Sequence, residues 1–375
     1  MLRFYGFVIA LAAVGFIYES TSQHERGAVL ADVSRAGSVS PASPMLEPRS
    51  GHTATLLQDG KVLIAGGMRR NQDFYRSAEL YDPVTEVFQA TGPMSIARVG
   101  PAAVLLGSGK VLVVGGWVGH GCTDSAEIYD PAAGKFTVIA KMTAKRGRPN
   151  ATLLANGDVL ITGGADHDTP GGVASAEIFR AADAKFEPVG PMHFARIAQT
   201  TTMLRDGRVL IAGGRGDTVT ASAEIYDPAT KQFSVTGSMF SARYKHTAGL
   251  LPDGRVLVAG GSDQRDWQGK LNSAEIYDPR TQKFSAASPL NDNRFKLPEK
   301  AVQLASGQVL IAGGSKKVEI YDPPSGKFQI SAGQMNDARH FMTATRLKDG
   351  SVLLAGGYPN DDQGTTETWI YHPSK

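Results

Sequence analysis

The stretch HTATLLQDGKVLIAGG, residues 52–67, decides the fold because near-copies of it recur along the 375-residue chain. Two of them read TTTMLRDGRVLIAGG at 200–214 and HTAGLLPDGRVLVAGG at 246–261. Each copy ends in a glycine pair, and successive pairs lie 43 to 53 residues apart, at Gly66/Gly67, Gly115/Gly116, Gly163/Gly164, Gly213/Gly214, Gly260/Gly261, Gly313/Gly314 and Gly356/Gly357. Seven repeats of nearly fixed period are typical of propellers, solenoids and arrays.

Every unit presents the same order of elements. Two apolar runs flank a polar turn such as Asp59-Gly60, which predicts a tight hairpin. The second run lacks alternation, as in a strand covered on both faces. After the glycine pair come a loop of variable length, a third strand ending in AEIYDP or a close relative, and a segment with an aromatic residue: Phe88, Phe136, Phe186, Phe233, Phe284 or Phe328. We therefore expect a four-stranded meander per unit.

The glycine pair, the Tyr-Asp-Pro and the following aromatic resemble the kelch repeat over residues 37–375. This resemblance implies an all-β fold, a seven-bladed β-propeller of four-stranded kelch blades. The last unit ends at TWIYHPSK without its aromatic strand. Counting back from Arg49 by the spacing of the other units places Met45 at the usual methionine position and Val39 at the aromatic one. We expect residues 37–40 to supply the outer strand of the last blade and so close the ring.

The N-terminal segment indicates export. Arg3 precedes fifteen mainly apolar residues, Phe4 to Tyr18, and small residues follow. As a helix this run would reach about 22 Å, less than a bilayer core of about 30 Å. We interpret residues 1–22 as a signal peptide or signal anchor and 23–36 as a linker. The protein is then periplasmic or extracellular, and it contacts the membrane only if this segment stays uncleaved.

Net charge, motifs and cysteine count limit the classes of partner and cross-link that we expect. The net charge of +3 is small, and the chain has no zinc-finger spacing or phosphate loop, so we expect no nucleic-acid partner. Cys122 is the only cysteine, which excludes an intramolecular disulfide.

A basic position recurs where the first strands are expected to begin. Seventeen residues before each glycine pair stand Arg49, Arg98, Arg146, Arg196, Arg243, Lys296 and Arg339. Arginine forks bind carboxylate, sulfate or phosphate, and the kelch resemblance implies that arginines at a similar place can bind acidic peptides. Each unit also carries a glutamate at the start of its third strand, namely Glu79, Glu127, Glu177, Glu224, Glu275, Glu319 or Glu367. The same cations could therefore form a structural latch in each blade.

Other candidate binding residues lie on the same face. The variable loops after the glycine pairs carry Trp117, Trp267, Tyr358, Phe74 and Tyr75, which can stack on sugars or fill pockets of a partner. We also expect four polar side chains to point toward the channel mouth: His52, His246, Gln199 and Glu299.

These features favour an exported kelch-repeat recognition module that binds a carbohydrate, an acidic ligand or a partner protein through its loop-bearing face, without a metal or other cofactor. Two alternatives stay open. One is an enzyme of oxidase or epimerase type acting on a sugar or sugar acid at the channel mouth, and the other is a purely structural repeat domain. A distant similarity to the galactose oxidase propeller implies a copper site of tyrosines, histidines and a cysteine cross-linked to tyrosine. That set is incomplete here, because Lys245 precedes His246 and no tyrosine is placed to cross-link Cys122.

Overall fold

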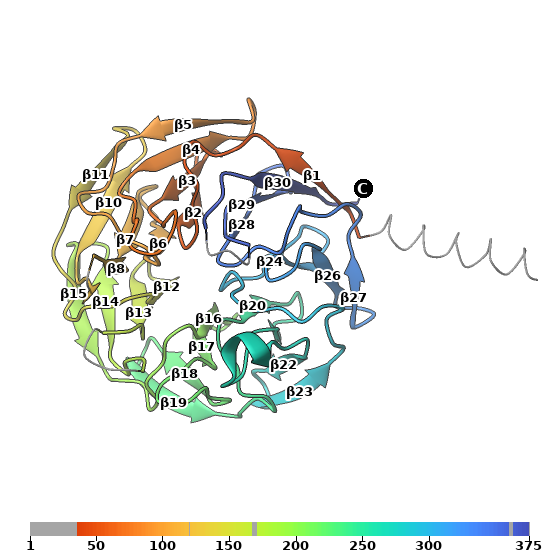
Figure 1. Ribbon diagram of the computed structural model, residues 1–375. Helices are drawn as coiled ribbons and strands as arrows, with labels where there is room; N and C mark the ends of the chain where they lie inside the picture. The colour runs from red at the N-terminus through yellow and green to blue at the C-terminus, as the bar shows by residue number, and fades with distance from the viewer. Residues whose placement is uncertain (1–35, 120, 167–170, 360–362, 375) are drawn as a thin grey trace, which may run out of the picture.

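A computed structural model describes residues 36–119, 121–166, 171–359 and 363–374. These residues form seven four-stranded antiparallel sheets arranged radially around one axis (Figure 1). The expected all-β, seven-bladed propeller is therefore confirmed. The expected signal segment and all but the last residue of the expected linker lie outside the described residues. Within the described ranges, no helix is long and apolar enough to cross a membrane.

The strands follow one another from the axis outward in each blade. Blade one contains β2 (Thr53–Leu56), β3 (Val62–Ala65), β4 (Ala78–Asp82) and β5 (Val87–Thr91). Blade two contains β6 (Ala102–Leu105), β7 (Val111–Val114), β10 (Ala126–Asp130) and β11 (Lys135–Val138), with the small hairpin β8 (Trp117–Val118) and β9 (Gly121–Cys122) in its loop. Blade three contains β12 (Asn150–Leu153), β13 (Val159–Thr162), β14 (Ala176–Arg180) and β15 (Lys185–Val189).

The remaining blades repeat this plan. Blade four contains β16 (Thr200–Met203), β17 (Val209–Ala212), β18 (Ala223–Asp227) and β19 (Gln232–Thr236). Blade five contains β20 (Thr247–Leu250), β21 (Val256–Ala259), β22 (Ala274–Asp278) and β23 (Lys283–Ala287), with the 3-10 turn η1 (Asp266–Gly269) in its loop. Blade six contains β24 (Val302–Gln303), β25 (Val309–Ile311), β26 (Glu319–Asp322) and β27 (Lys327–Ile330). Blade seven contains β28 (Thr343–Arg346), β29 (Val352–Ala355), β30 (Thr368–His372) and β1 (Ser38–Ala42).

The repeated sequence explains the repeated blade. Gly60 in the predicted hairpin turn has a φ of 96°, and its amide donates to the Leu57 carbonyl at 3.1 Å. The second glycine of the pair is required by shape as well: Gly67 has a φ of 93°, and a Cβ there would lie 2.8 Å from the backbone oxygen of Ser50. Any side chain larger than a hydrogen atom would therefore clash where the chain leaves the second strand.

The core lies between neighbouring sheets, where the apolar second strands are buried on both faces. All four residues of β3 are at most 1% exposed. The conserved spacing of aromatics within the repeats places Tyr81 against Phe88, with ring centroids 4.8 Å apart, and equivalent pairs in blades two to six lie 4.8 to 5.0 Å apart. These pairs fix the outer strand to the third strand in each blade.

The ring closes through the N-terminal strand. β1 pairs with β30 in antiparallel register, with Val39 opposite Tyr371. Val39 thus takes the place that an aromatic holds in the other blades, as expected, and the strand extends to Ala42 rather than ending at residue 40. Val39 is buried in a cluster with Trp369 and Tyr371, and the Tyr371 hydroxyl donates to the Ala36 carbonyl at 3.1 Å.

Candidate functional site at the channel mouth

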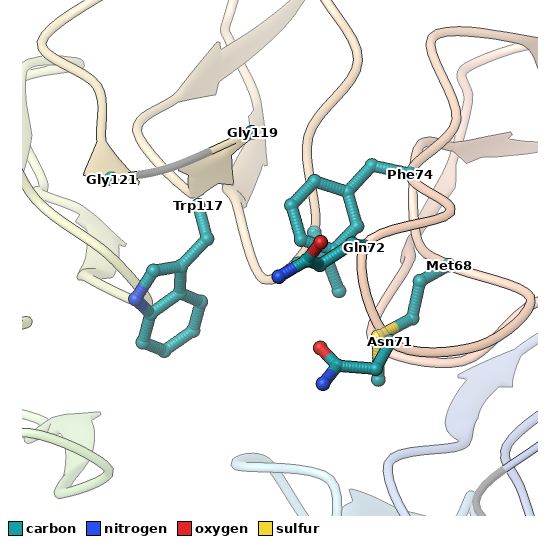
Figure 2. Close-up of a pocket in the computed structure, with 8 residues that line it drawn as sticks. Met68, Asn71, Gln72, Phe74, Trp117, Gly119 and Gly121 are labelled. Carbon is teal, nitrogen blue, oxygen red and sulfur yellow. The ribbon is translucent and has the colours of Figure 1, made fainter.

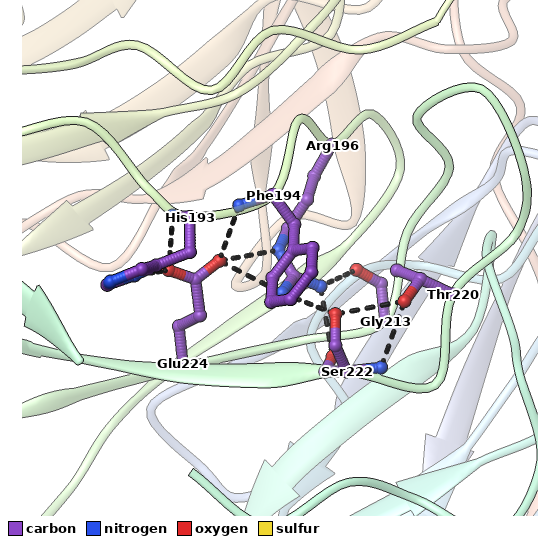
Figure 3. A network of polar contacts seen from close by, with 7 residues as sticks. All are labelled: His193, Phe194, Arg196, Gly213, Thr220, Ser222 and Glu224. Carbon is purple, nitrogen blue, oxygen red and sulfur yellow. Dashed lines mark hydrogen bonds and ion pairs between the residues drawn. The ribbon is translucent and has the colours of Figure 1, made fainter. Parts of the chain in front are cut away.

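The recurrent arginines are held in buried networks, as blade four illustrates (Figure 3). Arg196 donates to the Glu224 carboxylate from Nε and Nη2, at 3.3 and 3.0 Å, and to the Gly213 carbonyl at 2.6 Å. The other Glu224 oxygen accepts the backbone amide of His193 at 2.7 Å. The network joins the chain entering the blade to the second and third strands, and both charged groups are buried.

Each of the seven blades contains this ion pair, which we call the latch. The pairs are Arg49–Glu79, Arg98–Glu127, Arg146–Glu177, Arg196–Glu224, Arg243–Glu275, Arg294–Glu319 and Arg339–Glu367. The arginines are at most 3% exposed. These guanidinium groups bond to a carboxylate and to backbone carbonyls within their own blade. None of the six latch arginines proposed as ligand-binding residues lines the cavity at the channel mouth.

Blade six differs from the sequence-based expectation. The latch residue is Arg294, not Lys296, because this blade has two more residues between the latch and the hairpin turn than its neighbours. Counting back from the glycine pair misses this insertion. Counting forward finds it, since Arg294 follows Phe284 by ten residues, as Arg98 follows Phe88.

Two residues after each latch arginine, the chain turns at the channel mouth with a left-handed backbone, and we call these seven residues the rim. Their φ values lie between 52° and 62°, at Gly51, Gly100, Arg148, Ala198, Lys245, Lys296 and Phe341. Rim residues of adjacent blades are joined by backbone hydrogen bonds: the amides of Gly100, Gly51, Phe341 and Lys245 donate to the carbonyls of Gly51, Phe341, Lys296 and Ala198, at 2.8 to 3.0 Å.

The rim is chemically asymmetric. Blades one and two use glycine, the residue that this backbone favours, whereas Arg148, Lys245 and Lys296 hold long cationic side chains in the same conformation. A left-handed backbone costs a non-glycine residue about 1–2 kcal/mol, and such strain gathers at functional sites. Five rim residues share this strain, and three of them are these cations.

A cavity of about 620 Å³ lies inside the rim, and we call it the axial cavity. The segments that lead into the inner strands form its walls. All seven blades contribute lining residues, none of them from an outer strand; Gly100, Tyr244 and Phe341 are examples. Its charged lining residues in the described part of the chain are Arg148, Arg215, Lys245, Lys300 and Glu299. Four cations thus face one carboxylate.

Lys245 has an unusual environment in this cavity. Its Nζ lies 3.0 Å from Asp266 Oδ1 and donates to the Tyr244 hydroxyl at 3.2 Å. Burial, together with the nearby charges of Lys296 and Arg148, lowers the pKa of Lys245 to about 8, although Asp266 acts in the opposite direction. The amine is therefore close to titration near neutral pH.

Glu299 is the carboxylate of the axial cavity. Asn150 Nδ2 donates to it at 2.7 Å, and Arg148 Nε lies 3.4 Å from its other oxygen. Burial raises the pKa of Glu299, while Arg148 and Lys300 act in the opposite direction. The Arg148 guanidinium also lies 4.2 Å from the centroid of the Phe341 ring. The two-residue insertion in blade six brings Glu299 and Lys300 into the channel.

The other polar side chains expected at the channel mouth are placed differently. His52 lines the axial cavity, although it is largely buried and its Nε2 lies 3.0 Å from Thr343 Oγ1 of blade seven. His246 and Gln199 are buried beside the neighbouring blade, with His246 Nε2 3.0 Å from Thr200 Oγ1 and Gln199 Nε2 donating to the Thr162 carbonyl. Because of these bonds, His246 and Gln199 join neighbouring blades and do not line the axial cavity.

His52 is neutral near pH 7, since burial, with the charge of Arg49, lowers its pKa to about 3.

The two tryptophans named from the sequence lie in the loops of blades two and five. Trp117 of β8 lines the axial cavity. Trp267 in η1 is 44% exposed, and its ring packs edge-on against Phe295 and His340. Lys270 Nζ lies 3.7 Å from the Trp267 ring centroid, which covers part of that ring with a cation.

Comparison with known proteins agrees with this architecture. Residues 98–143 and 243–291 match the model of the kelch motif. No curated protein matches the chain significantly. Among solved structures, a fungal alcohol oxidase of the AA5 family, determined in complex with copper, is similar with a TM-score of 0.73 and 16% identity, over 90% of this chain and 76% of that one.

Within the described residues, no three His, Cys, Asp or Glu side chains gather closely enough to hold a metal ion. Cys122 is buried, and burial raises the pKa of its thiol. The likeness to the oxidase is therefore one of fold. The chain is therefore a seven-bladed β-propeller of four-stranded blades that contains kelch motifs at residues 98–143 and 243–291.

Proposed function

We propose that this protein is an exported recognition module that binds the acidic group of a carbohydrate in its axial cavity. The charge of that cavity carries the proposal, since four of its five charged lining residues are cationic. Low-dielectric walls focus such a field and favour a carboxylate, sulfate or phosphate. The guanidinium groups of Arg148 and Arg215 suit these anions, and the buried Nε of Arg215 has no hydrogen-bond partner among the described residues.

The remaining lining suits a sugar ring. Trp117, Tyr244 and Phe341 supply aromatic surface beside the cations. The cavity volume of about 620 Å³ is in the ordinary range for small-molecule sites. Export is supported by the apolar N-terminal run after Arg3, so the ligand is proposed to be extracellular or periplasmic.

The test is calorimetric titration of the full chain with glucuronate, galacturonate and N-acetylneuraminate, and with neutral glucose and galactose. We expect binding of at least one acid, and a loss of about tenfold or more in the R148M/K245M double variant. The control variant K185M removes an outer-strand lysine that is 70% exposed and should bind as the parent does. Equal affinity in parent and double variant, or binding of neutral sugars alone, would contradict the proposal.

A second candidate, an enzyme acting on a sugar acid, is favoured by one observation. Glu299 and Lys245 line the same cavity, and burial shifts the pKa of the carboxyl upward and that of the amine downward to about 8. Opposed shifts of this kind are typical of acid–base pairs. If the protein is an enzyme, E299Q should abolish conversion of the bound acid, followed by NMR, while binding persists. An unchanged sugar after long incubation with the parent would exclude this candidate for that acid.

A further inference from the structure

A second cavity opens beside the axial cavity on the loop-bearing face. It has a volume of about 570 Å³ and lies between the loop after β3 in blade one and the β8–β9 hairpin of blade two (Figure 2). We call it the side groove. It is lined by Met68, Asn71, Gln72, Phe74, Val99 and Trp117, with Gly119 and Gly121.

The side groove and the axial cavity are neighbours with a shared boundary. Met68, Val99 and Trp117 line both. A ligand in the axial cavity therefore lies next to the groove, with these three side chains at the boundary.

The two cavities differ in chemistry. None of the described residues that line the groove carries a charge, in contrast to the axial cavity. Phe74 and Trp117 form aromatic walls, and Figure 2 shows the side-chain amides of Asn71 and Gln72 near them. Aromatic faces accept the apolar face of a sugar ring, and amides both donate to and accept from hydroxyl groups. Gln72 also has a left-handed backbone, with a φ of 65°, although it is not glycine.

The Trp117 indole occupies space that two glycines, Gly100 and Gly147, leave open. A Cβ on Gly100 would lie 2.9 Å from the indole, and one on Gly147 would lie 2.6 Å from it and 2.7 Å from Cys122 Sγ. Gly147, unlike Gly100, is not among the residues of positive φ, so space alone requires glycine there. The indole therefore packs closely against these two glycines, at the boundary of the two cavities.

We infer that the side groove is a subsite for a neutral sugar unit linked to the acidic unit in the axial cavity, so that the ligand is an acidic oligosaccharide. This inference rests on the proposed function. The charged cavity takes the acid, and the uncharged groove takes the adjoining ring.

The experiment compares two affinities for each protein. Glucuronate, galacturonate and N-acetylneuraminate are titrated as free monosaccharides and as disaccharides in which the acid is joined to one neutral hexose. In the parent we expect a disaccharide to bind about tenfold more tightly than its acid alone. F74A should reduce this ratio to about one. The control F240A removes an aromatic that is 73% exposed and lines neither cavity, and it should preserve the ratio.

The outcomes separate the two proposals. A parent ratio near one for every acid, or a tenfold ratio that persists in F74A, would overturn the groove inference and leave acid binding intact. Failure of every acid to bind would overturn the proposed function and the groove inference with it. Melting curves check folding, and if F74A does not fold, the N71A/Q72A double variant replaces it with the same expected loss of the ratio.

Discussion

The strained rim residues offer a test at the scale of single residues. Lys245 adopts a φ of 53°, a conformation that glycine adopts without steric cost. K245G should therefore raise the free energy of unfolding by up to about 1 kcal/mol, since relief of strain exceeds the entropy that glycine adds to the unfolded chain. The same variant should lose affinity for the acidic ligand. Denaturant unfolding and titration of one preparation measure both, and a destabilised variant with full affinity would contradict a functional origin for the strain.

Ligand binding should depend on pH through Lys245. Its pKa of about 8 means that the ammonium is charged below pH 8 and loses its charge above it, while a sugar carboxylate stays ionised throughout. Affinity should be greatest below pH 8 and fall by up to about tenfold per pH unit above it. In K245R the guanidinium remains charged, so affinity should be nearly constant from pH 7 to 9. Parallel pH profiles in the two proteins would exclude Lys245 as the titrating group.

Sequence reasoning located the latch residues and only part of the site: His52, Glu299 and Trp117 were named from the sequence, and all three line the axial cavity. It found six of the seven latch arginines and every latch glutamate, because these positions repeat. It named Lys296 for the wrong reason, since the cation belongs to the rim rather than to the latch. Arg148 and Lys245 were not proposed, although they stand two positions after a latch arginine, where blades one and two have glycine. The available signal was that blades three and five have a cation at the position where blades one and two have Gly51 and Gly100.

At the scale of the structural element, the latch stabilises each blade. Arg243 and Glu275 are both buried and pair at 2.9 Å. R243M leaves the carboxylate buried without its guanidinium, so the free energy of unfolding should fall by about 3–5 kcal/mol. The control R280M removes an arginine that is 78% exposed beside Asp278, and its melting curve should match the parent's. Equal melting temperatures for R243M and R280M would show that the latch does not stabilise the blade.

Blade six shows why elements were easier to predict than their bounds. Its Ser306-Gly307 turn and its third strand follow the repeat, yet β24 has two residues where other inner strands have four. Next to the insertion, Lys300 forms a parallel bridge with Ala248 of blade five instead. Local sequence patterns do not report such pairing between blades, and this pairing places Glu299 in the axial cavity.

At the scale of the whole molecule, β1 joins the two ends of the described chain. Deleting residues 23–44 removes all five of its residue pairs with β30 and the buried Val39. The melting temperature should fall by several degrees or more, because blade seven then exposes the edge of β30 and part of its core. An unchanged melting curve would mean that closure by β1 adds nothing to stability.

The fold could be predicted in full and the site only in part, because the fold depends on repeated residues and the site on unrepeated ones. Seven copies of one pattern imply seven similar sheets, and radial packing follows from covering both faces of each. The axial cavity depends instead on the unrepeated residues of blades three to six, such as Arg148, Arg215 and Lys245, which become neighbours only around the axis.

The most direct measurement of the central claim is a crystal structure with the acidic sugar that binds most tightly. We predict its acidic group inside the rim, within hydrogen-bond distance of Arg148 and Lys245. A sugar bound on the outer strands or at the hairpin-turn face, with no sugar in the axial cavity, would contradict the account.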